Sequence, residues 1–339
     1  MILTAFVSSA ASTEDKAAKI LEIAWTQVEQ PGELVRLCPG TERINDASLA
    51  LTRSIQTLPW TEHPHINDCY TGYDQSASLL HWLSEEEVDA TVLLVDDACL
   101  FAGAYREEVL PGQGLGFSWS EAPSGEGPFA LSASYEPLRA FCVARDLELP
   151  RVQLPLLIHS VDLLKVLPRW LELTAIIRHD VRLGGSDEQI LDENATTVAL
   201  NIAAAEYGIG LRGSDFGGAI LHADSHAERY TARYQDLERA LTNFDWWKQV
   251  VPAPKSGVRQ GRVLDQVYLE SGWPPQMSQL NSSAAAIWQR CDGQRDLWAI
   301  AEELSLRFDV PLPQILPDVT STALQFRQQG ALSFTRRIE

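Results

Sequence analysis

Two adjacent aspartates, Asp96 and Asp97, follow a run of apolar residues in the stretch ATVLLVDDACLF, residues 90–101. The run has β-branched residues at its start and the length of a buried strand. Carboxylates at the end of such a strand either form a solvated turn or hold a hard divalent cation, because Mg²⁺ and Mn²⁺ prefer oxygen ligands. Both interpretations stay open at this point, and they lead to different chemistry for this half of the chain.

A histidine and a group of acidic residues occur further along the chain. His222 ends a short predicted strand in GGAILHADSH. Its imidazole could complete a cation site with Asp97, or it could bond to the backbone where the strand ends. Asp187, Glu188 and Asp192 precede an alanine-rich helical segment. One of these carboxylates could orient or deprotonate a hydroxyl group, or all three could simply favour a helix N-terminus.

The elements that must position these residues alternate in type. Over the first hundred residues, predicted strands in MILTAFVSS, ELVRLCPG and 91–95 alternate with predicted helices. Such alternation favours a parallel sheet with helices on its faces. Open α/β sheets bind ligands outside the carboxyl ends of their strands, which is where Asp96 and Asp97 fall.

The bulk properties limit the function classes. A chain of 339 residues with 45% hydrophobic and 22% charged residues is long enough for two soluble globular domains. A net charge of −19 argues against broad nucleic-acid binding and against docking on anionic membranes. Five cysteines without a CxxC pair indicate free thiols in a reducing cytoplasm. A linker rich in Pro, Lys, Ser and Gly predicts domains at 1–250 and 259–339.

The C-terminal segment has a compact layout. GRVLDQVYLE and PPQMSQLN are predicted to be two strands, and Asn281 or Ser282 is predicted to cap the first of three helices. Apolar residues at i, i+3 and i+4 spacing give each helix one core face. They are Ala284, Ile287 and Trp288; Leu297, Ile300, Ala301, Leu304 and Phe308; and Ile315, Val319, Ala323 and Phe326. The pattern predicts a small winged-helix-like α+β module.

This segment resembles the PqqD-like family of peptide-recognition domains, also called RiPP recognition elements. The resemblance rests on Leu-Asn before the first helix, Ile-Trp within it, Cys-Asp-Gly at the turn, Phe-Asp-Val-Pro before the third helix, and a late Gly. It implies that the leader of a precursor peptide adds as a strand to the sheet edge and packs on the third helix. The implied peptide-binding residues are Met277, Ser278, Gln279, Leu280, Val319, Ala323 and Phe326.

A winged helix that binds DNA is the alternative for the same module. The acidic chain argues against it, and so does the third helix, in which Arg327 is the only basic residue.

The first 245 residues resemble the hydroxyproline O-arabinosyltransferases and their bacterial relatives, which are glycosyltransferases of the GT-A type. The matching segments, in order, are TAFVSSA, YDQSASLLHWLSE, TVLLVDDACLF, LPLLIHSVDLLKVLPRWLEL and VALNIAAAEYGI. The resemblance implies a Rossmann-like mixed sheet with helices on both faces. It also implies an Asp-x-Asp motif, a divalent metal (Mn²⁺ or Mg²⁺) and a nucleotide sugar, with a UDP-sugar expected.

The chain departs from that motif. If Asp97 takes the second acidic position, Val95 stands at the first; if Asp96 takes the first, Ala98 stands at the second. Either way, one expected carboxylate is missing.

The resemblance also implies roles for individual residues. The implied metal ligands are Asp97 and His222, and the implied catalytic carboxylates are Asp187, Glu188 and Asp192. The implied nucleotide-binding residues are Thr4, Phe6, Ser8, Tyr73, Asp74 and Asp96. For Asp74, capping of a helix is the alternative role.

Together the two resemblances lead us to expect a cytoplasmic peptide-modifying glycosyltransferase of a ribosomal peptide natural-product pathway. It would hold the leader of a precursor peptide and transfer a sugar to one of that peptide's side chains. Neither a nucleic acid nor a membrane is expected as a partner. Two alternatives stay open: an inactive scaffold that holds the peptide for another enzyme, or a transferase of the same fold that uses a non-sugar donor.

Overall fold

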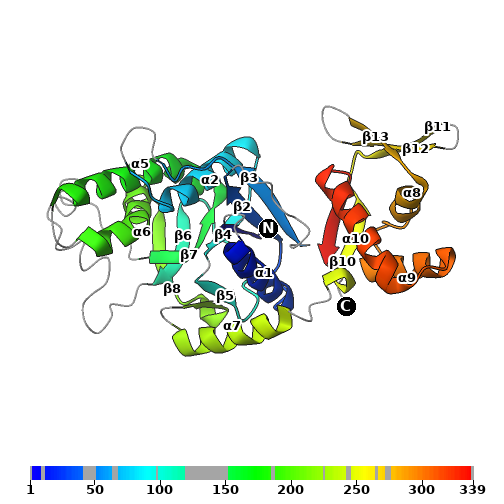
Figure 1. Ribbon diagram of the computed structural model, residues 1–339. Coiled ribbons are helices and arrows are strands. Elements are labelled where there is room, and N and C mark those ends of the chain that lie inside the picture. Colours follow the sequence, from blue (N-terminus) through cyan, green and yellow to red (C-terminus); the bar gives the residue numbers. More distant parts are fainter. Residues whose placement is uncertain are drawn as a thin grey trace. The chain divides into compact units, whose positions relative to one another are not determined.

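The computed structural model describes residues 2–8, 12–40, 51–62, 68–96, 98–118, 152–184, 188–223, 226–241, 246–263, 266–271 and 276–336. The chain divides into two compact units (Figure 1). The N-terminal unit comprises Met1–Ile44 and Thr52–Leu241, and the C-terminal unit comprises Asn45–Leu51 and Thr242–Glu339. Each unit has its own sheet and its own helices, so each is described by itself.

A seven-stranded mixed sheet forms the centre of the N-terminal unit, with the order β3-β2-β1-β4-β7-β6-β8. Its strands are β1 (Ile2–Val7), β2 (Glu33–Pro39), β3 (Thr52–Thr57), β4 (Thr91–Val95), β6 (Gln113–Ser118), β7 (Val152–His159) and β8 (Gly210–Ser214). The first four strands are parallel to one another, β7 runs antiparallel to both of its neighbours, and β8 is parallel to β6. The predicted mixed α/β sheet is therefore confirmed.

Helices cover both faces of this sheet (Figure 1). They are α1 (Ser12–Gln27), α2 (Gly72–Glu85), α5 (Ser160–Gly184), α6 (Glu188–Glu206) and α7 (Ala227–Leu241). Buried residues of α2, α5 and α6 share one core cluster with alternate residues of the strands, such as Leu3 and Ala5, because side chains alternate between the two faces of a strand. In Figure 1, α1 and α7 lie on the other side of the sheet.

A second, two-stranded sheet lies just beyond β4. It consists of β5 (Cys99–Phe101) and β9 (Ile220–His222), which pair antiparallel with Cys99 opposite His222. The short 3₁₀ helix η2 (Phe216–Gly218) precedes β9. This pairing brings a segment more than a hundred residues away in sequence beside the end of β4.

The C-terminal unit combines two small sheets with three helices. The sheets are the pair β10 (Val250–Pro254) and β14 (Leu332–Arg336), and the antiparallel sheet of β11 (Arg259–Val263), β12 (Gln266–Ser271) and β13 (Gln276–Leu280). The helices are α8 (Ser282–Trp288), α9 (Leu297–Phe308) and α10 (Leu312–Gln328), and the 3₁₀ helix η3 (Trp246–Lys248) precedes β10. Asn281 caps α8 by accepting a hydrogen bond from the Ala284 amide at 2.8 Å. The predicted α+β module is confirmed.

Two sequence predictions are corrected by this architecture. The stretch GRVLDQVYLE was predicted to be one strand, but it contains β11 and β12, which pair antiparallel with Val263 opposite Gln266. The boundary predicted near residue 250 lies later than the division at Leu241 and Thr242. The reason is that Val250–Pro254 pairs with β14 and so belongs to the C-terminal unit.

No helix within the described ranges has the length and the apolar content that crossing a bilayer requires.

Candidate functional site

The carboxyl ends of β1 and β4 define the candidate site of the N-terminal unit. These strands are parallel neighbours, with Phe6 opposite Val95. From β1 the chain runs to β2 and β3 on one side, and it returns to β4 on the other side of β1. Ligands of open α/β sheets bind in the crevice where the strand order reverses in this way. Two adjoining cavities lie at this point in the structure.

The larger cavity has a volume of about 460 Å³. One wall is apolar and comes from α1, and the rest combines strand ends with the segment before α2 and with α7. Its lining residues are Phe6, Val7, Ser8, Ala17, Ala18, Ile20, Leu21, Pro39, Pro59, Thr61, Thr71, Asp74, Asp96, Cys99, Leu100 and Tyr234. A mostly apolar cavity of this size with a few polar groups is typical of small-molecule sites.

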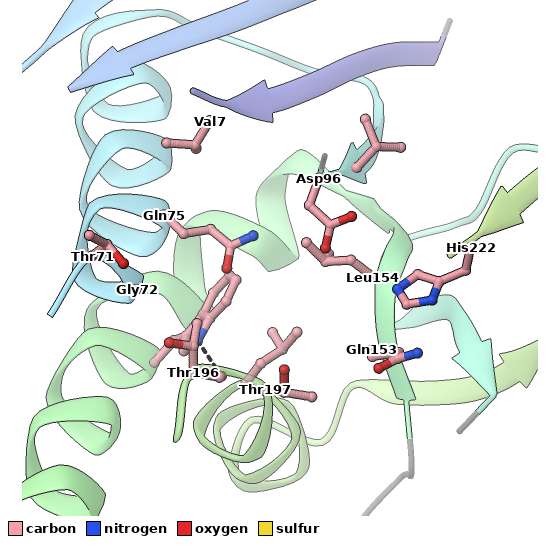
Figure 2. Close-up of a pocket in the computed structure, with 13 residues that line it drawn as sticks. Val7, Thr71, Gly72, Gln75, Asp96, Gln153, Leu154, Thr196, Thr197 and His222 are labelled. Carbon is pink, nitrogen blue, oxygen red and sulfur yellow. Dashed lines mark hydrogen bonds between the residues drawn. The ribbon is translucent and has the colours of Figure 1, made fainter. Parts of the chain in front are cut away.

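The smaller cavity, of about 270 Å³, lies on the other side of Asp96 (Figure 2). It shares Val7, Thr71 and Asp96 with the larger cavity. Its other lining residues are Gly72, Gln75, Val95, Gln153, Leu154, Trp170, Thr196, Thr197, Leu200 and His222. Because β7 runs antiparallel to β4, the first residues of β7 lie at the same edge of the sheet as Asp96.

Asp96 stands where the two cavities meet. Its Oδ1 accepts hydrogen bonds from the Ala98 amide and from the Cys99 thiol, both at 3.1 Å. The carboxylate therefore closes the turn that follows β4 and also faces the cavities. Its partner in the sequence, Asp97, lies outside the described residues. At Asp96, the role in a turn and the predicted role in a cation site are therefore compatible with each other.

His222 lines the same cavity as Asp96. It is buried at the end of β9, and its ring stacks on Phe117 with 5.5 Å between ring centroids and 16° between planes. Its backbone amide donates to His226 Nδ1 at 3.3 Å. Figure 2 shows the imidazole and the Asp96 carboxylate on the same side of the cavity.

Whether these residues suit a divalent metal can be tested on their chemistry. Among the described residues, no three His, Cys, Asp or Glu side chains come close enough to form a metal site by themselves. Mg²⁺ is usually held by one or two carboxylates together with substrate phosphates, rather than by a complete protein cage. Asp96 and His222 fit that partial type of site, and the metal-binding role stays a prediction.

The predicted nucleotide-binding residues divide into two groups. Phe6, Ser8, Asp74 and Asp96 line the larger cavity. Ser8 Oγ accepts a hydrogen bond from Arg36 at 3.1 Å. Asp74 accepts from the Trp60 amide at 2.6 Å and from Thr61 Oγ1 at 2.7 Å, and Thr71, not Asp74, is the N-cap residue of α2.

Thr4 and Tyr73 do not line either cavity, so their predicted contact with a nucleotide is corrected. Thr4 is buried in β1, and its hydroxyl has no hydrogen-bond partner among the described residues. Tyr73 is fully buried and donates to Asp68 Oδ2 at 2.6 Å. Burial, followed by the bond to Asp68, raises the pKa of Tyr73 above its ordinary value. Its role is to support the segment before α2.

A buried ion pair, which sequence reasoning missed, anchors that segment. Arg178 of α5 bonds both carboxylate oxygens of Asp68, at 2.7 and 3.0 Å, and both side chains are 3% exposed. The guanidinium also lies 3.8 Å from the centroid of the Tyr70 ring. Tyr70 in turn accepts a hydrogen bond from Thr196 Oγ1 at 3.1 Å. A Cβ at Gly72 would collide with Tyr70 and Thr196, so this wall of the smaller cavity is packed tightly.

The predicted catalytic carboxylates can be placed only in part. Asp187 lies outside the described residues, and Glu188 and Asp192 belong to the first turns of α6, with side chains that are not described. Thr196 lines the smaller cavity. Asp192 lies four residues before Thr196 in the same helix, which is about one helical turn. The catalytic role stays a prediction.

The C-terminal unit has a groove of about 320 Å³ between β13 and α10. Among the described strands, β13 pairs only with β12, so its second edge is not used in the sheet. The lining residues are Ser278, Gln279, Leu280, Asn281, Ser283, Ala284, Ile287, Asp318, Ser321, Thr322, Gln325, Phe326 and Gln329. Unpaired N–H and C=O groups at such an edge can accept an additional strand.

The predicted peptide-binding residues on β13 and α10 need one correction. Ser278, Gln279, Leu280 and Phe326 line the groove, whereas Met277 is 70% exposed outside it. Val319 and Ala323 are fully buried in the core of the module, so they face away from the groove. The groove face of α10 instead follows the helical repeat of the polar residues Asp318, Ser321, Thr322, Gln325 and Gln329.

Comparison with known proteins agrees with the predicted C-terminal resemblance. The family model described as coenzyme PQQ synthesis protein D (PqqD) matches residues 266–332. A curated "PqqA binding protein" from Xanthomonas axonopodis pv. citri (strain 306) is 41% identical over 83 residues, which are 24% of this chain and 88% of that protein.

The N-terminal unit has a more distant structural likeness. The crystal structure of the galactosyltransferase LgtC in complex with donor and acceptor sugar analogues is 14% identical, with a TM-score of 0.38, and the match covers 70% of this chain and 96% of that one. A sequence identity and a TM-score this low do not support an activity for the N-terminal unit, so its activity has to be argued from its own residues.

The Asp68–Arg178 pair gives a stability prediction. Arg178→Met leaves the Asp68 carboxylate buried without its cation, which should cost about 3–5 kcal/mol of unfolding free energy. Arg239→Met, which removes one partner of an exposed ion pair on α7, should cost at most about 1 kcal/mol. Urea unfolding of the full chain, followed by circular dichroism, measures both. Equal effects of the two substitutions would contradict the anchoring role.

Proposed function

Because the chain belongs to the PqqD family through its C-terminal unit, we propose that this unit holds a precursor peptide while the N-terminal unit glycosylates one of the peptide's side chains. The observation that supports peptide binding is the groove between β13 and α10. The observation that supports glycosylation is the pair of cavities that meet at Asp96. The two parts are argued separately below.

Peptide binding is supported by the edge of β13. An extended leader segment would pair with this edge through main-chain hydrogen bonds and place alternate side chains against α10. The Xanthomonas relative is named for binding PqqA, which makes a peptide the expected partner here as well. Most of the side chains that α10 presents to the groove are uncharged and polar, so the backbone of the leader would supply much of the recognition.

Donor binding is supported by the position and lining of the larger cavity. Its apolar α1 wall and the Tyr234 ring suit a nucleobase and ribose, since bases stack well on aromatic side chains. The diphosphate of a UDP-sugar would then reach Asp96. A Mn²⁺ or Mg²⁺ ion, when bound there, would offset negative charge on the leaving nucleotide. Asp96 and His222, together with Asp97, are the residues that would hold it.

For the acceptor, the proposed chemistry is attack of a side-chain hydroxyl on the anomeric carbon. The glycosidic C–O bond forms as the bond to the nucleoside diphosphate breaks, and the hydroxyl proton passes to a carboxylate. Asp187, Glu188 and Asp192 are the candidates for that general base. Holding leader and active site in one chain raises the local concentration of the acceptor to about the millimolar range for a short flexible connection.

One observation favours a second function. One acid of an Asp-x-Asp motif is missing, at Val95 or at Ala98 depending on the register, as expected if the N-terminal unit has lost catalysis and serves as a scaffold for another enzyme. A same-fold transferase with a non-sugar donor is distinguished by the mass that it adds.

A thermal-shift measurement tests donor binding. Mn²⁺ with UDP-glucose at about 100 times the Kd should stabilise the full chain by about 2.7 kcal/mol. Asp96→Asn should remove most of this shift, and Asp236→Asn on the exposed face of α7 should keep it. An unchanged melting temperature for the wild-type chain with every nucleotide would favour the scaffold function.

Intact-mass analysis tests the reaction. Co-expression with the candidate precursor peptide encoded nearest to this chain's gene should add one or more pentose or hexose masses to the peptide. Asp97→Ala should abolish the added mass without changing peptide binding, since the groove lies in the other unit. Full modification by the Asp97→Ala variant would reject the metal-binding role of that residue.

A steric block tests the groove. Ser321→Trp places an indole in the groove and should weaken peptide binding at least about tenfold, a change of about 1.4 kcal/mol. Gln314→Trp, on an exposed position of the same helix that does not line the groove, is the matched control. Fluorescence polarisation with a labelled leader peptide measures both, and equal affinities would exclude this groove as the binding site.

A further inference from the structure

We propose that the smaller cavity binds an uncharged, hydroxyl-rich sugar of the donor, and that Gln75 and Gln153 select this sugar against acidic ones. The inference rests on the proposed function and deepens it, because it names the class of group transferred. It comes from the chemistry of the cavity wall.

Apart from Asp96 and His222, the polar side chains that the described part of this wall presents are uncharged. They are the amides of Gln75 and Gln153 and the hydroxyls of Thr71, Thr196 and Thr197. Amide and hydroxyl groups both donate and accept hydrogen bonds, as sugar hydroxyls do. A wall of this kind can satisfy several hydroxyl groups without burying a net charge.

Neither glutamine amide of this wall has a hydrogen-bond partner in the part of the chain that the structure describes. The Gln153 side chain belongs to a residue that is only 8% exposed, and none of the described residues forms a hydrogen bond with its amide. The same holds for the amide of Gln75, which Figure 2 shows projecting from α2 into the cavity. Sugar hydroxyls that enter the cavity could therefore bond to both amides in place of water.

An acidic sugar would meet an unfavourable field in the same place. Among the described residues that line this cavity there is no lysine or arginine, and the one carboxylate is that of Asp96. Arg178, on the far side of Tyr70, is already bonded to Asp68. A uronic-acid carboxylate would therefore lose its hydration without gaining a cation, and it would lie near another negative charge. Any ion held at Asp96 would be shared with the diphosphate.

The position of the cavity agrees with this assignment. It adjoins the proposed nucleoside site and shares Val7, Thr71 and Asp96 with it. A nucleotide sugar that spans both cavities would place its diphosphate beside Asp96 and its sugar between α2, β7 and α6.

The experiment compares donors that differ in one group. The full chain with Mn²⁺ is titrated calorimetrically with UDP, UDP-glucose, UDP-galactose and UDP-glucuronate. Both neutral sugars should bind at least about tenfold more tightly than UDP-glucuronate, because the carboxylate is desolvated without a partner. Equal binding of UDP-glucose and UDP-glucuronate would overturn the inference. Binding of no UDP compound at all would overturn the proposed donor site together with the inference.

Substitutions at Gln75 sharpen the test. Gln75→Arg supplies the missing cation, so the ratio of affinities for UDP-glucuronate and UDP-glucose should rise at least about tenfold, the scale of a charge-assisted hydrogen bond. Gln75→Leu and Gln153→Leu should weaken UDP-glucose binding and leave UDP binding unchanged. Gln235→Arg on the exposed face of α7 is the control for added charge. An unchanged ratio in Gln75→Arg, with UDP still bound, would refute the role of Gln75 and leave the nucleotide site standing.

Discussion

The parallel pairing of β1 with β4 sets the geometry on which the N-terminal site depends. Phe6 is opposite Val95, and this is the last pair in the register between the two strands. The backbone and side chains that follow them, at Val7, Ser8 and Asp96, cannot pair with each other and so face the two cavities. Helices cover both faces of this mixed sheet, and polar groups from α2, β7 and β9 gather at this edge beside Asp96.

Asp96 closes a turn of the fold and also faces two cavities. The turn after β4 needs an acceptor for the Ala98 amide, and the same turn starts β5, which pairs with β9 and brings His222 to the cavity. Under the proposed function, a ligand or ion at Asp96 would meet a side chain whose orientation the turn has already fixed. Preorganisation of this kind lowers the entropy lost on binding. The sequence left a turn and a ligand site open as alternatives; the structure shows the turn, and the ligand site stays a prediction that is compatible with it.

Local patterns predicted the parts of the structure that depend on neighbouring residues. The alternation of strands and helices, the Asn281 cap and the position of Asp96 at a strand end follow from spacing within short segments. Tyr73 shows the limit, since its partner Asp68 is paired with Arg178, which lies 110 residues beyond Asp68. On α10, the PqqD-like resemblance implied that Val319 and Ala323 contact the peptide, but both are apolar residues of the kind that mark the buried face of a helix. The polar residues beside them form the groove face. The sequence alone does not show which exposed residues of α10 these are, because that depends on how the helix packs on β13.

Under the proposed function, the two units divide recognition between different kinds of interaction. Strand addition at β13 depends on main-chain groups that every peptide has, so the groove can tolerate variation in leader sequence and gains selectivity from few side-chain contacts. The smaller cavity has the opposite character, because its amides and hydroxyls must each find a partner on the group that enters. A missing or charged partner there leaves a buried polar group unsatisfied, which discriminates more strongly than a change in apolar contact. Substrate choice in such a protein would therefore depend more on the donor cavity than on the peptide groove, while the groove supplies the local concentration that lets a weakly bound acceptor react.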